Sequence, residues 1–289
     1  MKVALTLDDL PQWHEYPYPK GHSARSVADA LVGGFSRHGI QGVYAFANSK
    51  PFEVDALLRN VLDDWCAAGH CIANHTHSHP ILHQTTADHY IADLDIANAL
   101  LAPWIVKAPG RYFRYTWNIR GETQEKFEAV CQHLEALEYQ PADCSSWFFE
   151  WDWDLAYIGC LERNDANGIR FLKQAFVEFA KEQLLYDDAG MRRVFGRSVP
   201  HILLLHNVSF IELVLNDFLA SLHELGVEFI SLDEAMADEA YGEPAKFPCG
   251  EFLIYWRKLL WRDGIESAEI PGSQMANYNR VLNMVSPHH

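Results

Sequence analysis

Short apolar runs alternate with longer helical patterns along the 289 residues, and this alternation narrows the possible folds more than any other feature. Strand-like runs lie at residues 3–7, 43–47, 71–74, 111–115, 201–206 and 227–230. Helical patterns cover residues 23–38, 53–68, 86–101, 122–137, 169–185, 211–225 and 233–238, with Ser23 and Thr86 placed to cap two of them. Strands that alternate with helices run parallel, so the sequence predicts an α/β sheet or barrel.

A shift to Gly and Pro around residues 242–250 indicates a boundary. We therefore expect a domain over residues 1–240 and a C-terminal helical extension over residues 241–289. One helical face of this extension is apolar: Phe252, Tyr255, Trp256, Leu259 and Leu260. Such a face predicts packing against the main domain, with an oligomer contact or a membrane-surface role as alternatives.

Charge and composition exclude several functions. The net charge of −16, with 23 scattered Lys and Arg, argues against a nucleic-acid partner and against polyanionic substrates. No run approaches the ~20 apolar residues that a membrane-spanning helix needs. The first residues lead into a strand without signal-peptide features, which predicts a cytoplasmic protein as the sequence stands, or an exported one if a leader was removed. The oligomeric state is not indicated.

Four groups of polar residues lie where predicted parallel strands end. Asp8 and Asp9 close the first strand, His75 to His79 follow the third, and Arg114 and His206 close two later strands. Because the carboxyl ends of parallel strands converge on one mouth, we expect these groups to form a single active site.

The spacing of two histidines indicates a metal site. His75 and His79 are four residues apart, so on a helical turn their rings would project from one face. Two histidines and a carboxylate are a common catalytic zinc set, and cobalt or nickel would also fit. Successive strand side chains point in opposite directions, so we expect one of Asp8 and Asp9 to bind the ion and the other to act as a base.

The same segments resemble the motifs of the NodB-homology polysaccharide deacetylases, carbohydrate esterase family 4. Thr-Leu-Asp-Asp, His-Thr-His-Ser-His-Pro, Phe-Arg, Asp-Cys-Ser-Ser-Trp and Leu-Leu-Leu-His occur in the family's order. The resemblance covers about residues 3–237, and the Asp-Asp-Leu-Pro continuation at 8–11 is similar to one branch of the family. It implies a distorted, incomplete (β/α) barrel.

The resemblance also implies a role for each motif residue. Asp8 would be the general base and His206 the general acid, with Arg114 orienting Asp8 through an ion pair. One divalent ion, Zn²⁺ before Co²⁺ or Ni²⁺, would be bound by Asp9, His75 and His79. The oxyanion would rest on the ion and on a backbone N–H, that of Trp117.

Two departures from the family pattern affect these assignments. No proline follows Arg114, and Ser146 stands before Trp147 where an aspartate commonly tunes the acid histidine. We expect either that Asp143, or an acid among residues 150–154, takes that role, or that the pKa of His206 is raised less than in the family. We place Trp117, Trp147 and Asp143 on the substrate side of the site.

Other histidines and aromatic residues near the motifs have two interpretations. His14 and His22 are candidates for lining the cleft, whereas His77 and His83 are expected on the rim or in solvent. A set of aromatic residues on predicted rim loops would either stack on sugar faces or simply pack: Trp13, Tyr16, Tyr18, Trp117, Trp147, Trp151 and Trp153. Cys144 has no base beside it and is rejected as a nucleophile.

The sequence therefore predicts a metal-dependent hydrolase that removes acetyl groups from N-acetylated amino sugars in a glycan or a small conjugate. The alternatives are a hydrolase of another amide or of an O-acetyl ester, and a non-catalytic protein that binds metal or carbohydrate. Asp8 and His206 argue against the last, since binding alone needs neither a base nor an acid.

Overall fold

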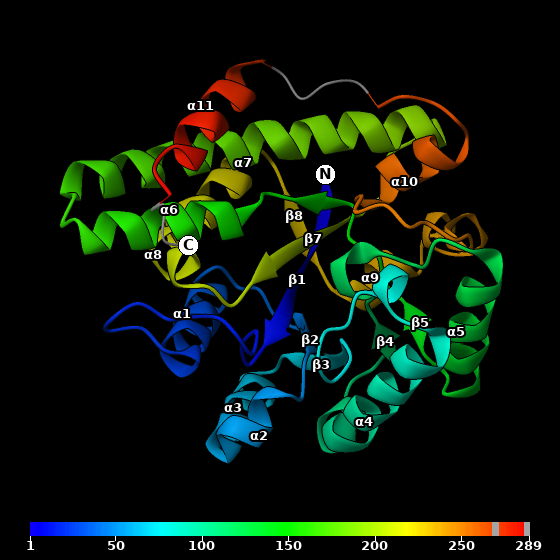
Figure 1. The fold of residues 1–289 in the computed structure, drawn as a ribbon. Coiled ribbons are helices and arrows are strands. Elements are labelled where there is room, and N and C mark those ends of the chain that lie inside the picture. The colour runs from blue at the N-terminus through cyan, green and yellow to red at the C-terminus, as the bar shows by residue number, and fades with distance from the viewer. Residues whose placement is uncertain (268–271, 286–289) are drawn as a thin grey trace.

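A parallel β-sheet forms the centre of the computed structural model, which describes residues 1–267 and 272–285 (Figure 1). Seven strands follow one another in the order β5-β4-β3-β2-β1-β7-β6, and β8 pairs with the first residues of β1 beside β2. The strands are β1 (Lys2–Leu10), β2 (Tyr44–Ala47), β3 (Cys71–Asn74), β4 (Tyr112–Phe113), β5 (Gln140–Pro141), β6 (Ser146–Trp147), β7 (His201–His206) and β8 (Glu228–Ile230). With its surrounding helices the sheet is a half-barrel, which confirms the predicted distorted, incomplete (β/α) barrel.

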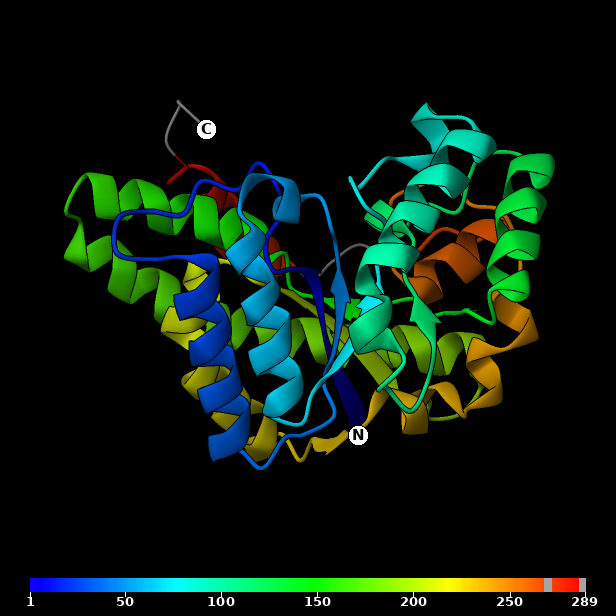
Figure 2. The ribbon, with the colours of Figure 1, turned by 90° about the horizontal axis from the view of Figure 1, so that it is seen from below.

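Helices connect and cover the strands. They are α1 (Ala24–Arg37), α2 (Pro51–Val54), α3 (Arg59–Ala67), α4 (Ala87–Ile105), α5 (Gln124–Ala136), α6 (Glu150–Glu162), α7 (Ala166–Phe195), α8 (Ser209–Glu224), α9 (Leu232–Met236), α10 (Tyr255–Arg262) and α11 (Gly272–Leu282). Helices α1 and α3 lie side by side, and α4 and α5 lie side by side toward the β5 end of the sheet (Figure 2). Within the described residues, every helix is too short or too polar to cross a membrane.

Local signals explain where several elements begin. The Ser23 hydroxyl accepts a hydrogen bond from the N–H of Ser26, and that of Thr86 from the N–H of His89, so both predicted caps are confirmed. Every residue of β1 after Lys2 is buried, as expected for a central parallel strand that is covered on both faces.

The segment between the fourth motif and α7 differs from the prediction of a tryptophan-rich loop. It contains α6, in which five consecutive residues, 156–160, are buried. A helix that is buried on all sides carries no 3.6-residue alternation of apolar and polar residues, so the periodicity did not reveal it.

Helix α7 continues well beyond the predicted end at residue 185. Gly190 within it lets Trp256 of α10 pack directly on the backbone, since a Cβ there would meet the Trp256 ring at 2.5 Å. Asp187 accepts a hydrogen bond from Trp256 Nε1 at 3.1 Å. These residues beyond 185 thus serve a helix–helix contact, and Gly196, in the left-handed conformation, ends the helix.

The C-terminal extension lies against the barrel through α10, in which Tyr255, Trp256, Leu259 and Leu260 are buried. Phe252 does not share that buried face, because it precedes the helix and is 42% exposed. Residues 268–271 and 286–289 of the predicted extension lie outside the described residues.

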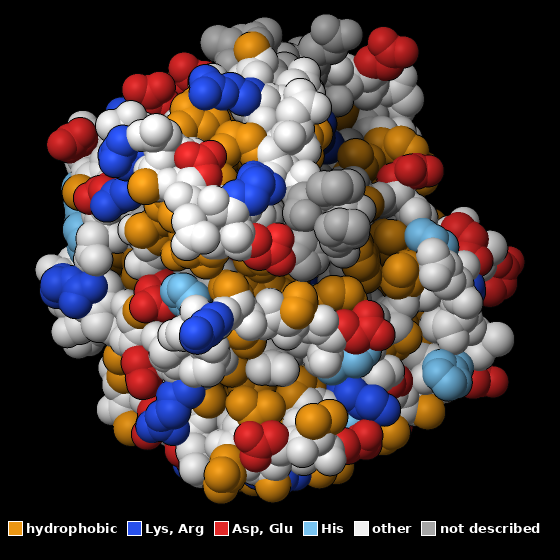
Figure 3. Space-filling view, turned by 60° about the vertical axis from the view of Figure 1, so that its left-hand side comes forward, with side chains coloured by type: hydrophobic (Ala, Val, Ile, Leu, Met, Phe, Trp, Pro, Cys, Tyr) orange, Lys and Arg blue, Asp and Glu red, His pale blue; other side chains and the backbone are white. Residues whose placement is uncertain are grey.

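Charged side chains of both signs are scattered over one face of the molecule (Figure 3). On the face drawn in Figure 3, acidic and basic residues alternate and the Lys and Arg side chains form no continuous patch.

Candidate metal centre and catalytic site

Three side chains from β1 and the loop after β3 meet at the carboxyl end of the sheet. Asp9 Oδ1 lies 3.6 Å from His79 Nε2 and 3.9 Å from His75 Nε2. The three ligand atoms lie within 4.8 Å of one another. A zinc ion lies about 2.1 Å from nitrogen and oxygen ligands, so these separations are close to those of atoms that share one ion.

The surroundings of this triad fit a cation. Asp9 Oδ1 is buried without a hydrogen-bond partner among the described residues. His75 Nδ1 lies 2.8 Å from the carbonyl oxygen of Arg114; it donates its proton there and leaves the Nε2 lone pair directed at Asp9. Burial lowers the pKa of His75 to about 3, lowers that of His79, and raises the pKa of Asp9 to about 7. A bound cation would supply the positive charge that this buried carboxylate lacks.

A backbone irregularity brings both aspartates to the site, contrary to the simple alternation expected from a strand. The pairing of β1 with β2 shifts register between Asp8 and Leu10, and Asp9 has a φ of 61°. This bulge turns Asp9 so that its carboxylate and that of Asp8, whose Oδ2 lies 3.6 Å from His75 Nε2, face the same place.

The two histidines come together through a loop, not through the helical turn predicted from their spacing. Thr76 and His79 both have positive φ, and the rings of His75 and His79 lie 4.9 Å apart. Asp93 of α4 holds this loop, because its carboxylate accepts hydrogen bonds from the N–H groups of His77 and Ser78 at 2.8 and 2.9 Å.

Asp8 is held by a buried arginine. Arg114 Nη1 donates to Asp8 Oδ1 at 2.7 Å and to Thr6 Oγ1 at 2.9 Å, while its Nε donates to the carbonyl of Ala142. The guanidinium lies over the Phe46 ring, 3.9 Å from its centroid. One carboxylate oxygen of Asp8 is thus fixed, and the other faces the triad, where it can accept a proton.

His206 lies opposite Asp8 in the β1–β7 pairing and is bound by a buried glutamate. Its Nδ1 lies 2.6 Å from Glu150 Oε1, at the start of α6, and Glu150 is fully buried. Burial alone lowers the pKa of His206, but Glu150, Asp9 and Asp8 together raise the pKa above its ordinary value. The imidazolium form is therefore favoured, as a general acid requires.

Glu150, one of the acids in the expected range 150–154, is the partner of His206, and Asp143 is not. The carboxylate of Asp143 binds Lys258 Nζ at 2.7 Å and the guanidinium of Arg120, and Asp143 does not line the cavity. Strand β6 ends before the acid, and the left-handed Phe149 turns the chain into α6, which is why a residue three positions after Trp147 reaches the site.

A cavity of about 450 Å³ opens over these groups. It is lined by Asp8, Asp9, Trp13, His75, His79, Trp117, Asn118, Trp147, Phe149, Trp151, Asp152, Leu204, His206, Phe252 and Tyr278. Trp117 has a φ of 56° and its ring lies 6.0 Å from that of His79. The Trp147 ring lies 5.9 Å from His206. Two lining residues, Phe252 and Tyr278, carried no sequence signal for the site, because they follow the last motif.

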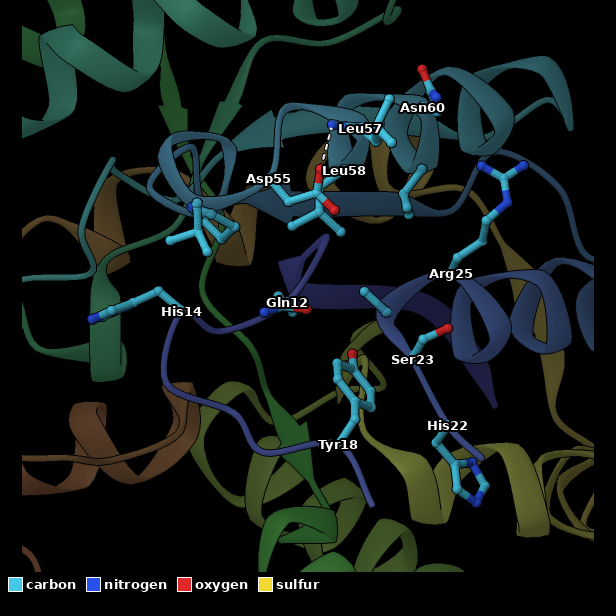
Figure 4. A pocket seen from close by; sticks show the side chains of 14 residues that line it. Gln12, His14, Tyr18, His22, Ser23, Arg25, Asp55, Leu57, Leu58 and Asn60 are labelled. Carbon is cyan, nitrogen blue, oxygen red and sulfur yellow. Dashed lines mark hydrogen bonds between the residues drawn. The ribbon is translucent and has the colours of Figure 1, made fainter. Parts of the chain in front are cut away.

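Other candidates lie away from this cavity. His14 and His22 line a second hollow of about 530 Å³ between the loop after β1 and the segment 51–61 (Figure 4). Gln12 also lines it, whereas Trp13 lines the first cavity, so this loop separates the two hollows.

Two residues that were expected on the rim are buried, and a third, Cys144, is confirmed as no nucleophile. Trp153, expected on a rim loop, is fully buried in the core. His77, expected on the rim, is also buried, with its ring bound to Ser49. Burial raises the pKa of the Cys144 thiol to about 11, which keeps it uncharged and unsuited to act as a nucleophile.

Residues 1–137 match the family model for polysaccharide deacetylases. No curated protein sequence matches the chain. The match confirms the predicted resemblance and the predicted class, a hydrolase of the polysaccharide deacetylase type that acts on carbon–nitrogen bonds.

Solved structures share the fold at low identity. A CE4 family pseudoenzyme from Bacillus anthracis is 14% identical with a TM-score of 0.52, covering 82% of this chain and 66% of its own. A mutant of it with restored activity is 16% identical, with a TM-score of 0.53 and coverages of 82% and 68%. The chain thus spans about two thirds of their length. The peptidoglycan deacetylase PdaC from Bacillus subtilis is 14% identical, with a TM-score of 0.50 and coverages of 81% and 88%.

Proposed function

We propose that this protein, which resembles the polysaccharide deacetylases in sequence and fold, is a metal-dependent deacetylase that hydrolyses the acetamide of N-acetylated amino sugars. One observation carries the proposal: a carboxylate fixed by an arginine and an imidazole fixed by a glutamate lie on neighbouring strands beside the Asp9–His75–His79 triad. Asp8 is bound by Arg114, and His206 is bound by Glu150.

Asp9, His75 and His79 would hold one divalent ion, Zn²⁺ in the first place, whose Lewis acidity polarises the acetamide carbonyl and acidifies water. Asp8 accepts the proton of the attacking water on Oδ2, while Arg114 keeps Oδ1 in place. The backbone N–H of Trp117, at the cavity wall, is proposed to donate to the developing oxyanion.

His206 gives a proton to the leaving amine. Its Nδ1 is engaged by Glu150, so Nε2 is the atom that carries the proton to the substrate. The negative charge of Glu150 stabilises the imidazolium before the transfer, and its hydrogen bond fixes the plane of the ring. Trp147 and Trp151, whose rings lie 5.9 and 5.6 Å from His206, surround the leaving group with apolar surface.

The acetate released from short N-acetylglucosamine oligomers tests this function. The protein is stripped with a chelator, reloaded with Zn²⁺, Co²⁺ or Ni²⁺, and compared with the stripped form. We expect release only after reloading. An O-acetylated sugar ester and an unrelated N-acetyl amide are assayed beside them; faster hydrolysis of either would identify the rival hydrolase. A metal-loaded protein that binds the oligomers and releases no acetate would be a binding protein.

A further inference from the structure

The wall of the catalytic cavity contains a continuous chain of aromatic rings that the C-terminal residues complete. Trp117 contacts Phe252 with centroids 5.8 Å apart, and Phe252 contacts Trp147 at 5.2 Å. Trp147 contacts Phe149 at 4.6 Å, and Phe149 contacts Tyr278 at 5.6 Å. We call these five residues the aromatic arc. Two of its five rings come from residues after the barrel.

Both C-terminal rings are anchored to the barrel. The Tyr278 hydroxyl donates to Asp152 on α6, and its ring stacks on Phe179 of α7 at 5.8 Å. Val281, one turn further along α11, is fully buried. Figure 1 shows α11 beside α6 and α7. These contacts fix the Tyr278 ring against α6 and α7.

Phe252 is held in the same way on the other side of Trp147. The N–H of Arg120 donates to the carbonyl of Cys249 at 2.9 Å, and that of Tyr255 donates to the carbonyl of Cys144 at 2.8 Å. The segment 249–255 is therefore tied at both ends to loops of the barrel that border the site.

The size and the lining residues of the cavity limit the ligands that it can bind. Its volume of about 450 Å³ lies in the lower part of the range of about 300–1,000 Å³ for small-molecule pockets. Seven of its fifteen lining residues are aromatic, and among the described lining residues there are three aspartates and no Lys or Arg. Aromatic faces cover the C–H faces of sugars.

We propose that Phe252 and Tyr278 determine specificity by closing one side of the cavity, so that it takes the terminal unit of an N-acetylamino-sugar chain and not an internal unit. This inference rests on the function proposed above. A substrate chain bound over the triad would extend away from the arc, because each ring of the arc contacts the next.

Oligomers of N-acetylglucosamine with two and six units test the inference with the metal-loaded, full-length protein. Mass spectrometry counts and locates the acetyl groups that are lost. We expect one terminal acetyl group to be lost from each chain. Loss from internal units of the hexamer overturns the inference and leaves the deacetylase function intact. No acetate from either oligomer overturns the proposed function, and the inference with it.

Variants test whether Phe252 and Tyr278 are responsible for the selectivity for terminal units. In Phe252→Ala and Tyr278→Ala we expect internal units of the hexamer to be deacetylated as well. The ratio of the deacetylation rate of the dimer to that of the hexamer should then fall about tenfold, the size of effect expected for the loss of one aromatic contact. Tyr278→Phe, which keeps the ring, should retain terminal selectivity. Trp261→Ala removes an aromatic ring of α10 that is 46% exposed and does not line the cavity, and should leave the ratio unchanged.

A variant that failed to fold would give no ratio, so Phe252→Leu is measured as well. It keeps apolar volume and should lower the ratio by a smaller factor. Terminal selectivity that persists in folded Phe252→Ala and Tyr278→Ala proteins overturns the assignment to these two residues.

Discussion

Replacing Glu150 by Gln removes the charge that supports His206 and keeps the shape of the side chain. Glu150 is fully buried and its Oε1 lies 2.6 Å from His206 Nδ1. The amide oxygen of Gln can still accept the Nδ1 proton, so the ring keeps its orientation. The hydrogen bond stays, but its acceptor loses its charge. Hydrogen bonds to charged groups contribute about 1.5–3 kcal/mol and neutral ones about 0.5–1.5 kcal/mol, so the loss is about 1–1.5 kcal/mol.

That energy sets the size of the expected effect on catalysis. At about 1.4 kcal/mol for each factor of ten, kcat should fall roughly tenfold. The pH profile should change as well. Glu150 raises the pKa of His206, so its loss lowers that pKa. A general acid works only while protonated, and the decline of kcat at high pH should therefore move to lower pH in Glu150→Gln.

The assay is acetate release from metal-loaded protein across a pH series, with metal content measured in each sample. Glu178→Gln makes the same chemical change at an exposed position of α7 and should match the unsubstituted protein. If Glu150→Gln kept both kcat and the position of the alkaline decline, the pairing of Glu150 with His206 would have no catalytic role and our reasoning would be refuted.

Three further predictions concern the groups around the site. His206→Ala should slow hydrolysis of the acetamide more than that of an activated acetyl ester in parallel kcat measurements, because only the amine leaving group needs a proton; equal slowing would mean that His206 only positions substrate. Arg114→Ala should lower the free energy of unfolding of the metal-free protein by about 3–5 kcal/mol in urea titrations, since it leaves Asp8 buried and unpaired; a change below about 1 kcal/mol would contradict this. Asp143→Ala should destabilise the protein more than Lys258→Met in the same titration. The first change leaves the buried Lys258 and Arg120 together without a carboxylate, whereas the second leaves Asp143 paired with Arg120. The reverse order would show that charge does not hold this cluster together.

The sequence predicted the parallel sheet and the convergence of the motif residues because both depend on local patterns. Apolar runs mark the strands, and polar residues at strand ends mark the mouth of the barrel. Asp8, Asp9, His75, His79, and His206 lie together in the cavity for this reason.

What the sequence did not reveal depends on backbone irregularity and on distant contacts. The bulge at Asp9 and the left-handed conformation of His79 direct side chains in ways that regular strand and helix periods exclude. Phe252 and Tyr278 reach the cavity only through the tertiary packing of the C-terminal segment. For the partner of His206, the sequence predicted a range of residues that includes Glu150. Which acid of that range reaches His206 depends on the turn at Phe149.

The metal content of the unsubstituted protein and of four variants tests the central claim most directly, with folding checked by circular dichroism. Elemental analysis should find one divalent ion per chain in the unsubstituted protein and in Asp8→Asn, and almost none in His75→Ala. His83→Ala, which removes a nearby histidine outside the triad, should keep the ion. Asp8→Asn should bind metal and yet release little acetate, because an amide cannot accept the proton of water. A folded His75→Ala protein that retained one ion per chain, or an Asp8→Asn protein that lost its metal as completely as Asp9→Asn, would contradict the account.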